Sequence, residues 1–126
     1  MSSHDPNCIF CKIVAGQIPS RKVFENDELL AFHDINPWAP VHVLVIPKGE
    51  YVSFDDFSAK ASPEAAAGFY RAVQKVAAAL GLGEKGYRVL SNVGPDAHQE
   101  VMHYHLHVFA GCDLGRMIKK GLAGEG

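Results

Sequence analysis

Three histidines fall within five consecutive residues, in the segment 101–109 with the sequence VMHYHLHVF. Side chains alternate across a β-strand, so His103, His105 and His107 are predicted to share one face. The other face receives the apolar side chains of Met102, Tyr104, Leu106 and Val108. An imidazole ring can act as a nucleophile, as a proton donor or acceptor, and as a metal ligand. One face of this strand is therefore predicted to pack in the core and the other to carry chemistry.

Two kinds of chemistry suit this row of rings. For zinc, residues on one face of a strand lie about 6.5–7 Å apart, so the outer pair hardly converges on one ion, although two neighbours could. Alternatively, the central ring attacks a phosphoryl or acyl centre while its neighbours orient it and hold developing negative charge. A purely structural polar face is disfavoured because charged rings repel one another and sheet formation does not require them. The row favours nucleophilic catalysis.

Five strands are predicted to position these residues. Alternating or continuous apolar runs, separated by turn-forming residues, indicate strands at 22–25, 29–33, 41–46, 87–91 and 101–110. The first three follow one another without intervening helices. This succession favours an antiparallel sheet of the α+β class over a parallel, doubly wound one.

One long helix is predicted to cover the apolar face of the sheet. Ser62 is suited to cap it, Pro63 to occupy its first turn, and Gly81 to end it. Between them, apolar residues recur at intervals of three and four, at Ala66, Phe69, Tyr70, Val73, Val76, Ala77 and Leu80. A shorter helix is predicted between a capping Asn7 and Gly16.

Length and composition limit the class of protein. The 126 residues suit a single domain, and 48% hydrophobic with 21% charged residues is typical of a globular chain. With a net charge of −2, the chain has no overall positive electrostatic field that would attract nucleic acid. No segment is apolar enough for a membrane span and the start resembles no signal peptide, so we expect a cytoplasmic protein. We expect the glycine-rich tail from about residue 115 to be flexible.

These motifs together resemble those of one known family. The segments 8–13, 31–37, 39–48 and 99–107 closely resemble the histidine triad (HIT) nucleotide-binding proteins, in particular the purine nucleoside phosphoramidase branch. The resemblance covers nearly the whole chain, as one domain over residues 1–126. It implies a five-stranded antiparallel sheet with one long helix and short helices on one side, and a homodimer whose two sheets join.

The resemblance also implies a reaction. His105 would attack the α-phosphorus of a nucleoside monophosphate carried on an amine or similar leaving group, forming a nucleotidyl-histidine that water then hydrolyses. His103 and His107 would position this nucleophile and hold the phosphate oxygens. No metal is required for these steps.

Further residues match binding positions of the family. Asp34 matches the acceptor of the ribose hydroxyls, although alone it would be read as a turn residue. The walls of the base pocket match Ile9, Phe10, Ile13, Phe32 and Ile35, which alone would be ordinary core. Contacts to phosphate or leaving group match Asn92, Gln99 and the backbone of Glu100 and Val101, and His42 matches a fourth histidine beside the triad.

The chain has three cysteines, and it departs from the family pattern at two places. Three cysteines are too few for a disulfide framework, which leaves reduced thiols or a metal. In some relatives the residues matching Cys8, Cys11 and His103 bind structural zinc, with Glu50 here at the fourth position. His98 stands where a glycine is common, and the C-terminal segment that shapes leaving-group preference in relatives is absent.

Three functions remain open from the sequence. The first is a hydrolase of purine nucleoside phosphoramidates or related AMP conjugates, which Ala110 and Gly111 favour over a dinucleoside polyphosphate hydrolase. The second is a nucleotide-binding or scaffold protein with little turnover. The third is a metalloprotein that uses His42 with two histidines of the triad.

Overall fold

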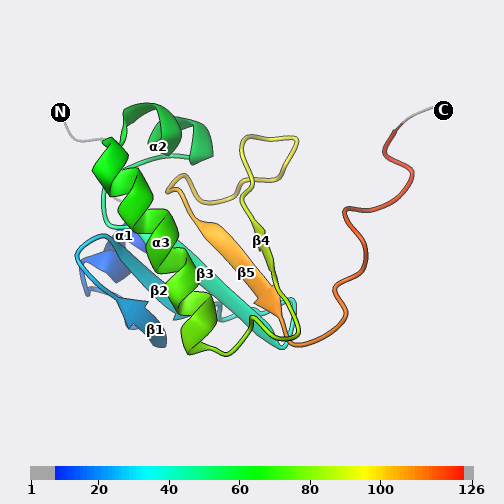
Figure 1. Cartoon of the computed structure of the whole chain (residues 1–126). Coiled ribbons are helices and arrows are strands. Elements are labelled where there is room, and N and C mark those ends of the chain that lie inside the picture. Colours follow the sequence, from blue (N-terminus) through cyan, green and yellow to red (C-terminus); the bar gives the residue numbers. More distant parts are fainter. Residues whose placement is uncertain (1–7, 124–126) are drawn as a thin grey trace.

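The computed structural model of the chain describes residues 8–123, in which three helices and five strands form one layered unit (Figure 1). In chain order the elements are α1 (Ile9–Val14), β1 (Lys22–Glu25), β2 (Leu29–His33), β3 (Val41–Pro47), α2 (Phe54–Lys60), α3 (Pro63–Ala79), β4 (Arg88–Leu90) and β5 (Leu106–Ala110). None of these helices is both long and apolar enough to cross a membrane.

The five strands form one antiparallel sheet in the order β1-β2-β3-β5-β4. β3 is central and pairs with β2 on one side and β5 on the other. Its register with β5 sets His42 opposite Phe109 and Leu44 opposite His107, so the fourth histidine reaches the triad from a neighbouring strand. The predicted fold class, with its antiparallel sheet and one long helix, is confirmed.

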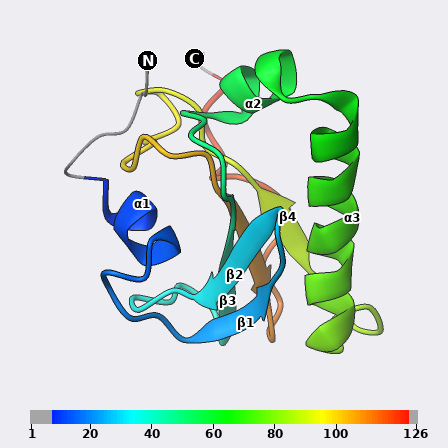
Figure 2. The ribbon, with the colours of Figure 1, turned by 90° about the vertical axis from the view of Figure 1, so that its left-hand side faces the viewer.

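Helices cover both faces of this sheet. α3 lies against one face and α1 against the opposite face (Figure 2). Ser62 caps α3 by accepting a hydrogen bond from the backbone N–H of Ala65 at 3.0 Å, with Pro63 in the first turn as predicted. The expectation of helices on one side only is therefore wrong, because Phe10 and Ile13 of α1 pack on the face that α3 leaves uncovered.

The alternation of side chains along the inner strands explains why the sheet needs two covers. On β2 and β3, one set of residues packs toward α3, namely Leu29, Ala31, Val43 and Val45. The intervening residues pack toward α1, namely Leu30, Phe32, Leu44 and Ile46. Both sets are buried, so these strands are apolar throughout, which is typical of strands covered on both faces.

The strand that carries the end of the histidine triad is shorter than predicted. β5 includes only the second half of the predicted strand 101–110, because Tyr104 donates its backbone N–H to the carbonyl of Tyr51 and not to a sheet partner. The alternation nevertheless persists, since Tyr104, Leu106 and Val108 all lie in the core beside α3. Met102 was assigned to the same face but is 51% exposed, so that assignment is wrong.

Other boundaries differ modestly from the prediction. β4 is shorter than the predicted 87–91, and β3 extends one residue beyond 41–46. The sequence interpretation did not place the short helix α2, although Ser53 caps it and Asp56 lies three residues later. Asn7, the predicted cap of the first helix, lies outside the described residues, and the cap in the structure is Cys8.

The tail after β5 is held at its beginning. Residues 115–123 contain no helix or strand, and Figure 1 shows them leading away from the sheet. The Arg88 guanidinium on β4 donates hydrogen bonds to the carbonyls of Leu114 at 3.1 Å and Gly115 at 2.7 Å. The flexibility of the remaining tail stays a prediction.

A pair of tyrosines links α3 to the histidine segment. The hydroxyls of Tyr70 and Tyr104 lie 2.9 Å apart, and Tyr104 is 1% exposed. We expect Tyr70→Phe to lower the free energy of unfolding by about 1–3 kcal/mol, because it leaves a buried hydroxyl unpaired. The variant carrying both Tyr70→Phe and Tyr104→Phe should recover part of this loss in urea unfolding. Strictly additive losses would contradict a direct pair.

Candidate functional site

His105 lies directly before β5 with its side chain turned toward α1. It is 8% exposed, and its ring lies edge-on to Phe10 with centroids 4.9 Å apart. Its Nδ1 is 2.7 Å from the carbonyl oxygen of His103. A carbonyl can only accept, so Nδ1 carries the proton, and Nε2 of the neutral ring keeps the lone pair. The hydroxyl of Ser91 donates to the carbonyl of His105 at 3.1 Å, which further fixes this segment.

The His103 ring is held by one nitrogen and faces two sulfurs with the other. Nε2 is 3.0 Å from the carbonyl of Pro47 and must donate to it, so Nδ1 of the neutral ring has the lone pair. Nδ1 faces the sulfurs of Cys11 at 3.3 Å and Cys8 at 3.8 Å. The ring of His103, which is 2% exposed, is thus directed away from His105 while its backbone carbonyl orients that residue.

His107 is oriented by a chain of hydrogen bonds. The backbone N–H of Trp38 donates to Nδ1 of His42 at 3.1 Å, so Nε2 of a neutral His42 carries the proton. That Nε2 lies 2.9 Å from Nδ1 of His107 and donates to it. His107 must then hold its own proton on Nε2. The triad consequently presents a lone pair at His105 and an N–H donor at His107, with ring centroids 5.0 Å apart.

Asp34 combines a turn role with a place at the site. Its Oδ1 accepts the backbone N–H of Asn36 at 2.8 Å, as expected for a turn residue. Its Oδ2 lies 3.5 Å from Nε2 of His42. The side chain is 20% exposed, so one carboxylate oxygen stands beside the histidines within reach of solvent.

Burial keeps these rings neutral. It lowers the pKa of His42, His103 and His105 below the ordinary histidine value, with the carboxylate of Asp34 opposing the shift at His42 and His105. The pKa of His107 falls to about 4 through burial and then through the neighbouring His105 and His42. At neutral pH the lone pair of His105 is therefore available, because neutral imidazole is the nucleophilic form.

The residues predicted to wall a base pocket divide into two groups. Phe10, Ile13 and Phe32 are buried together beneath α1, and the Phe10 and Phe32 rings pack edge-to-face at 5.9 Å. Ile9 is 42% exposed and Ile35 is 86% exposed. The structure thus brings a buried apolar floor against His105 and leaves two apolar side chains open to solvent.

Gln99 fastens the loop that leads into the triad. Its Nε2 donates to the carbonyls of Val52 at 2.7 Å and Val101 at 3.1 Å. Its Oε1 accepts the backbone N–H of Gly94 at 3.1 Å. Both amide protons are used within the protein, so the arrangement supports loop positioning by Gln99 better than direct contact with phosphate.

The other residues of this loop are more open. Asn92 is half-buried in the segment after β4, and Glu100 is exposed. Val101 is half-buried and packs against the apolar cluster beneath α1. His98 has a φ of 60°, in the left-handed region that favours glycine.

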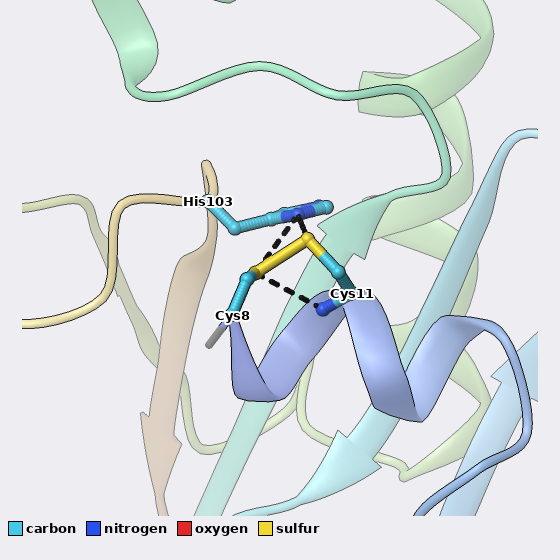
Figure 3. A group of neighbouring side chains, drawn as sticks. All are labelled: Cys8, Cys11 and His103. Atoms are coloured by element: carbon cyan, nitrogen blue, oxygen red, sulfur yellow. Dashed lines mark hydrogen bonds between the residues drawn. A yellow bond between two sulfur atoms is a disulfide. The ribbon is translucent and has the colours of Figure 1, made fainter. Parts of the chain in front are cut away.

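Two cysteines and His103 form a compact cluster at the start of α1, here named the cysteine–histidine cluster (Figure 3). Cys8 and Cys11 are paired as a disulfide with Cα atoms 5.3 Å apart, a state that the sequence analysis did not include beside reduced thiols and a metal. Three residues of separation at a helix start bring the two Cα atoms within disulfide range, even in a chain with few cysteines. Glu50 influences this cluster electrostatically, since its carboxylate acts to raise the pKa of His103.

The cysteine–histidine cluster has the donors of a zinc site. One ligand atom from each of Cys8, Cys11 and His103 lies within 4.8 Å of the others. The hydrogen bond from Nε2 of His103 to the Pro47 carbonyl directs the lone pair of Nδ1 at the two sulfurs, and histidines that bind a metal are commonly oriented by such a bond from their other nitrogen. The two sulfurs ligate only as thiolates, so an ion and a disulfide exclude each other here.

Asp34, His42 and His107 also lie within 4.8 Å of one another, but their hydrogen bonds disfavour an ion. Because Trp38 donates to Nδ1 of His42, the nitrogen of His42 that faces the group carries a proton. A metal there would require the loss of that proton or of the Trp38 bond. These hydrogen bonds argue against a metalloprotein that uses His42 with two histidines of the triad.

Several groups that define the site escaped sequence reasoning because they act through the backbone. They are the N–H of Trp38 and the carbonyls of Pro47 and His103. A backbone atom has no residue-type signature, so only the proximity of Trp38 to His42 along the chain offered a hint. Ser91 offered a weak signal, as a hydroxyl at the end of a predicted strand.

Comparisons with known proteins show which family the chain is similar to. Residues 15–114 match the family model of the HIT domain. A 13.2 kDa HIT-like protein of Azospirillum brasilense is 59% identical over 119 residues, which cover 94% of this chain and 98% of that protein. A HIT family hydrolase from Clostridium thermocellum superposes with a TM-score of 0.83 at 40% identity, covering 92% of this chain and 100% of that one. A histidine triad protein from Clostridium difficile gives 0.80 at 41% identity, covering 91% and 99%.

The assigned protonation states can be tested in solution. Nitrogen-15 correlation spectra of the histidine side chains near neutral pH should show His105 protonated on Nδ1, and His42 and His107 protonated on Nε2. His33, a half-buried histidine at the end of β2, serves as an internal reference. A spectrum with His105 protonated on Nε2 would contradict the bond to the His103 carbonyl.

The lowered pKa values predict how stability depends on pH. In the unfolded chain the histidines have pKa values of about 6.5. Below that pH the unfolded chain therefore binds protons that the buried histidines of the folded protein do not bind. Stability is therefore full above about pH 6.5 and falls as the pH decreases toward the folded value of about 4 for His107. Urea unfolding at several pH values measures this slope. The variant His107→Asn should flatten it, and equal slopes in both proteins would refute the assignment.

Proposed function

Since this chain belongs to the HIT domain family, we propose that it hydrolyses purine nucleoside phosphoramidates or related AMP conjugates through a nucleotidyl intermediate on His105. The observation that carries the proposal is the 2.7 Å contact between Nδ1 of His105 and the His103 carbonyl. It aims an unprotonated Nε2 away from the backbone. A buried, neutral and oriented imidazole is suited to attack at phosphorus.

In the first step a bond forms between Nε2 of His105 and the α-phosphorus, and the bond from phosphorus to the leaving nitrogen breaks. The leaving nitrogen takes a proton from solvent as it departs. His105 becomes positively charged, and the carbonyl of His103 stabilises this charge through the Nδ1–H bond. In the second step water attacks the phosphorus, releases Nε2 and returns one proton to solvent.

The neighbouring residues have separate roles in this scheme. His107 would donate a hydrogen bond from Nε2 to a phosphate oxygen, and His42 would keep its tautomer fixed. His103 would position the nucleophile through its carbonyl, since one ring nitrogen donates to the Pro47 carbonyl and the other faces the sulfurs of Cys8 and Cys11. A carboxylate oxygen of Asp34 would accept hydrogen bonds from the ribose hydroxyls.

The base would lie on the apolar floor beneath α1. Phe10 contacts the ring of His105, which places this floor directly beside the nucleophile. Ile9 and Ile35, now exposed, would be covered by a planar base. Burial of apolar surface on binding stabilises the complex by about 25 cal/mol per Å². No step of this reaction is routed through an ion or cofactor.

The cysteine–histidine cluster is proposed to hold a structural zinc ion. Cys8, Cys11 and His103 would be its ligands, and the ion would tie the start of α1 to the histidine segment. Glu50 stays a candidate for the fourth position. The cytoplasmic location inferred from the sequence also stays a prediction.

Trapping experiments test the covalent mechanism. With an AMP-amine substrate and a rapid alkaline denaturing quench, we expect an adduct of AMP on His105 by mass spectrometry. The variant His105→Ala should show no adduct and lose activity by a factor on the order of 10⁴ or more. The matched control His33→Ala replaces a histidine outside the site and should keep both.

The same experiments separate the alternatives. Tight AMP binding by calorimetry without turnover on any member of a substrate panel would favour a scaffold with little turnover. Preference for a dinucleoside polyphosphate over phosphoramidates would favour the other hydrolase. Undiminished turnover by His105→Ala would reject the mechanism altogether.

We also propose that two copies join through β4. This strand is at an edge of the sheet, and Val89 on it is 42% exposed. An apolar groove of about 440 Å³ borders it, lined mainly by Phe54, Tyr70, Val73, Val89, Leu90, Val93, Tyr104 and Leu106. An open edge strand beside exposed apolar side chains is a ready surface for pairing with a second chain.

A charge at this edge should prevent the pairing. We expect Val89→Asp to sediment as a monomer at concentrations where the original chain sediments as a dimer. Leu122→Asp introduces the same charge at an exposed apolar residue of the tail and should leave the dimer intact. A dimer that survives Val89→Asp would place the interface elsewhere.

A further inference from the structure

The two sulfurs of the cysteine–histidine cluster share one partner. Cys11 Sγ is 3.3 Å and Cys8 Sγ is 3.8 Å from the same Nδ1 of His103 (Figure 3). Because the other ring nitrogen donates to Pro47, the neutral ring offers a single lone pair toward both sulfurs. This lone pair can accept a thiol proton or ligate a metal, but a disulfide offers it neither. The state of the sulfur pair therefore decides what the ring binds.

The pair needs little movement to change state. The Cα atoms of Cys8 and Cys11 lie 5.3 Å apart, within the usual range for a disulfide. The ligand atoms of all three residues lie within 4.8 Å of one another, close enough to surround one ion. The same backbone can thus hold the sulfurs joined to each other or jointly bound to a metal.

Access to the pair is one-sided. Cys8 is 5% exposed, whereas Cys11 is only half-buried. A small reagent can reach Cys11 first, and Cys8 then stands behind it as the resolving thiol. The third cysteine, Cys112, is exposed and unpaired, which makes it the matched control.

We propose that Cys8 and Cys11 form a redox-active pair that exchanges with low-molecular-weight disulfides, and that its oxidation releases the metal ion from the cysteine–histidine cluster. The metal and the disulfide compete for the same two sulfurs. A reducing environment favours the metal-bound state, and an excess of a disulfide oxidant favours the metal-free state. This inference rests on the contacts of the cluster and is independent of the proposed hydrolysis.

Oxidation of the pair proceeds by two thiol–disulfide exchange steps. The Cys11 thiolate attacks one sulfur of the oxidant, forming a mixed disulfide and releasing one molecule of reduced thiol. The Cys8 thiolate then attacks the sulfur of Cys11, which forms the protein disulfide and releases the second thiol. The protein loses two electrons and the oxidant gains them. The two released thiolates take protons from solvent, and the metal ion leaves because its two sulfur ligands are now bonded to each other.

The test compares one chain in two oxidation states. The full chain carrying Cys112→Ser is reduced, or treated with oxidised glutathione, and then titrated with zinc and separately with cobalt. We expect the reduced chain to bind both metals, with cobalt giving a thiolate charge-transfer absorption. The oxidised chain should weigh two hydrogens less and bind neither metal, and a reductant should restore binding. Zinc should also raise the melting temperature of the reduced chain only.

Variants locate the effect at the pair. Cys11→Ser and Cys8→Ser should each abolish the cobalt absorption, and the original chain with its own Cys112 should behave as the Cys112→Ser chain does. Metal retained by the oxidised chain would overturn the proposal. So would a reduced chain that binds no cobalt, or a failure of the pair to oxidise. None of these readouts depends on hydrolysis, so their failure leaves the proposed hydrolysis standing, whereas a reduced chain that binds no cobalt would also reject the proposed zinc site.

Discussion

The hydrogen bond from Nδ1 of His105 to the carbonyl of His103 is the interaction on which the site depends. It exists because the segment before β5 leaves the regular strand geometry, with the backbone N–H of Tyr104 bonded to Tyr51. The side chain of Tyr104 is anchored in the core beside α3. The core position of the Tyr104 side chain and the irregular backbone thus hold His103 and His105 at a fixed distance and orientation.

Burial and hydrogen bonding act on the same rings with compatible results. Burial lowers the pKa of all four histidines of the site and keeps the rings neutral, while hydrogen-bond partners select the protonated nitrogen. The result differs from ring to ring, because His105 bonds to a carbonyl and His42 to a backbone N–H. Neighbouring residues of identical type therefore present opposite chemical faces, a lone pair at His105 and a donor at His107.

Sequence reasoning recovered the sheet, the long helix and the sidedness of the triad because these follow from periodicity. The alternation correctly set Tyr104 in the core opposite the histidines, even though this part of the segment is not a strand. It failed at Met102, where the backbone has left the sheet. The helix α2 was missed because seven residues give little periodicity, although Ser53 and Asp56 form a start signal. The bond that selects the tautomer of His105 was unpredictable, since its acceptor is a backbone atom.

The position of the phosphorus on the ring tests the central claim most directly. The protein is labelled with nitrogen-15 in its histidine side chains, and its nucleotidyl adduct is trapped under alkaline denaturing conditions. The coupling between nitrogen-15 and phosphorus-31 then identifies the ring nitrogen that is bonded to phosphorus. Because the His103 carbonyl holds the Nδ1 proton, we expect phosphorus on Nε2 of His105. Phosphorus on Nδ1 of His105, or on the ring of His103 or His107, would contradict the role assigned to that hydrogen bond.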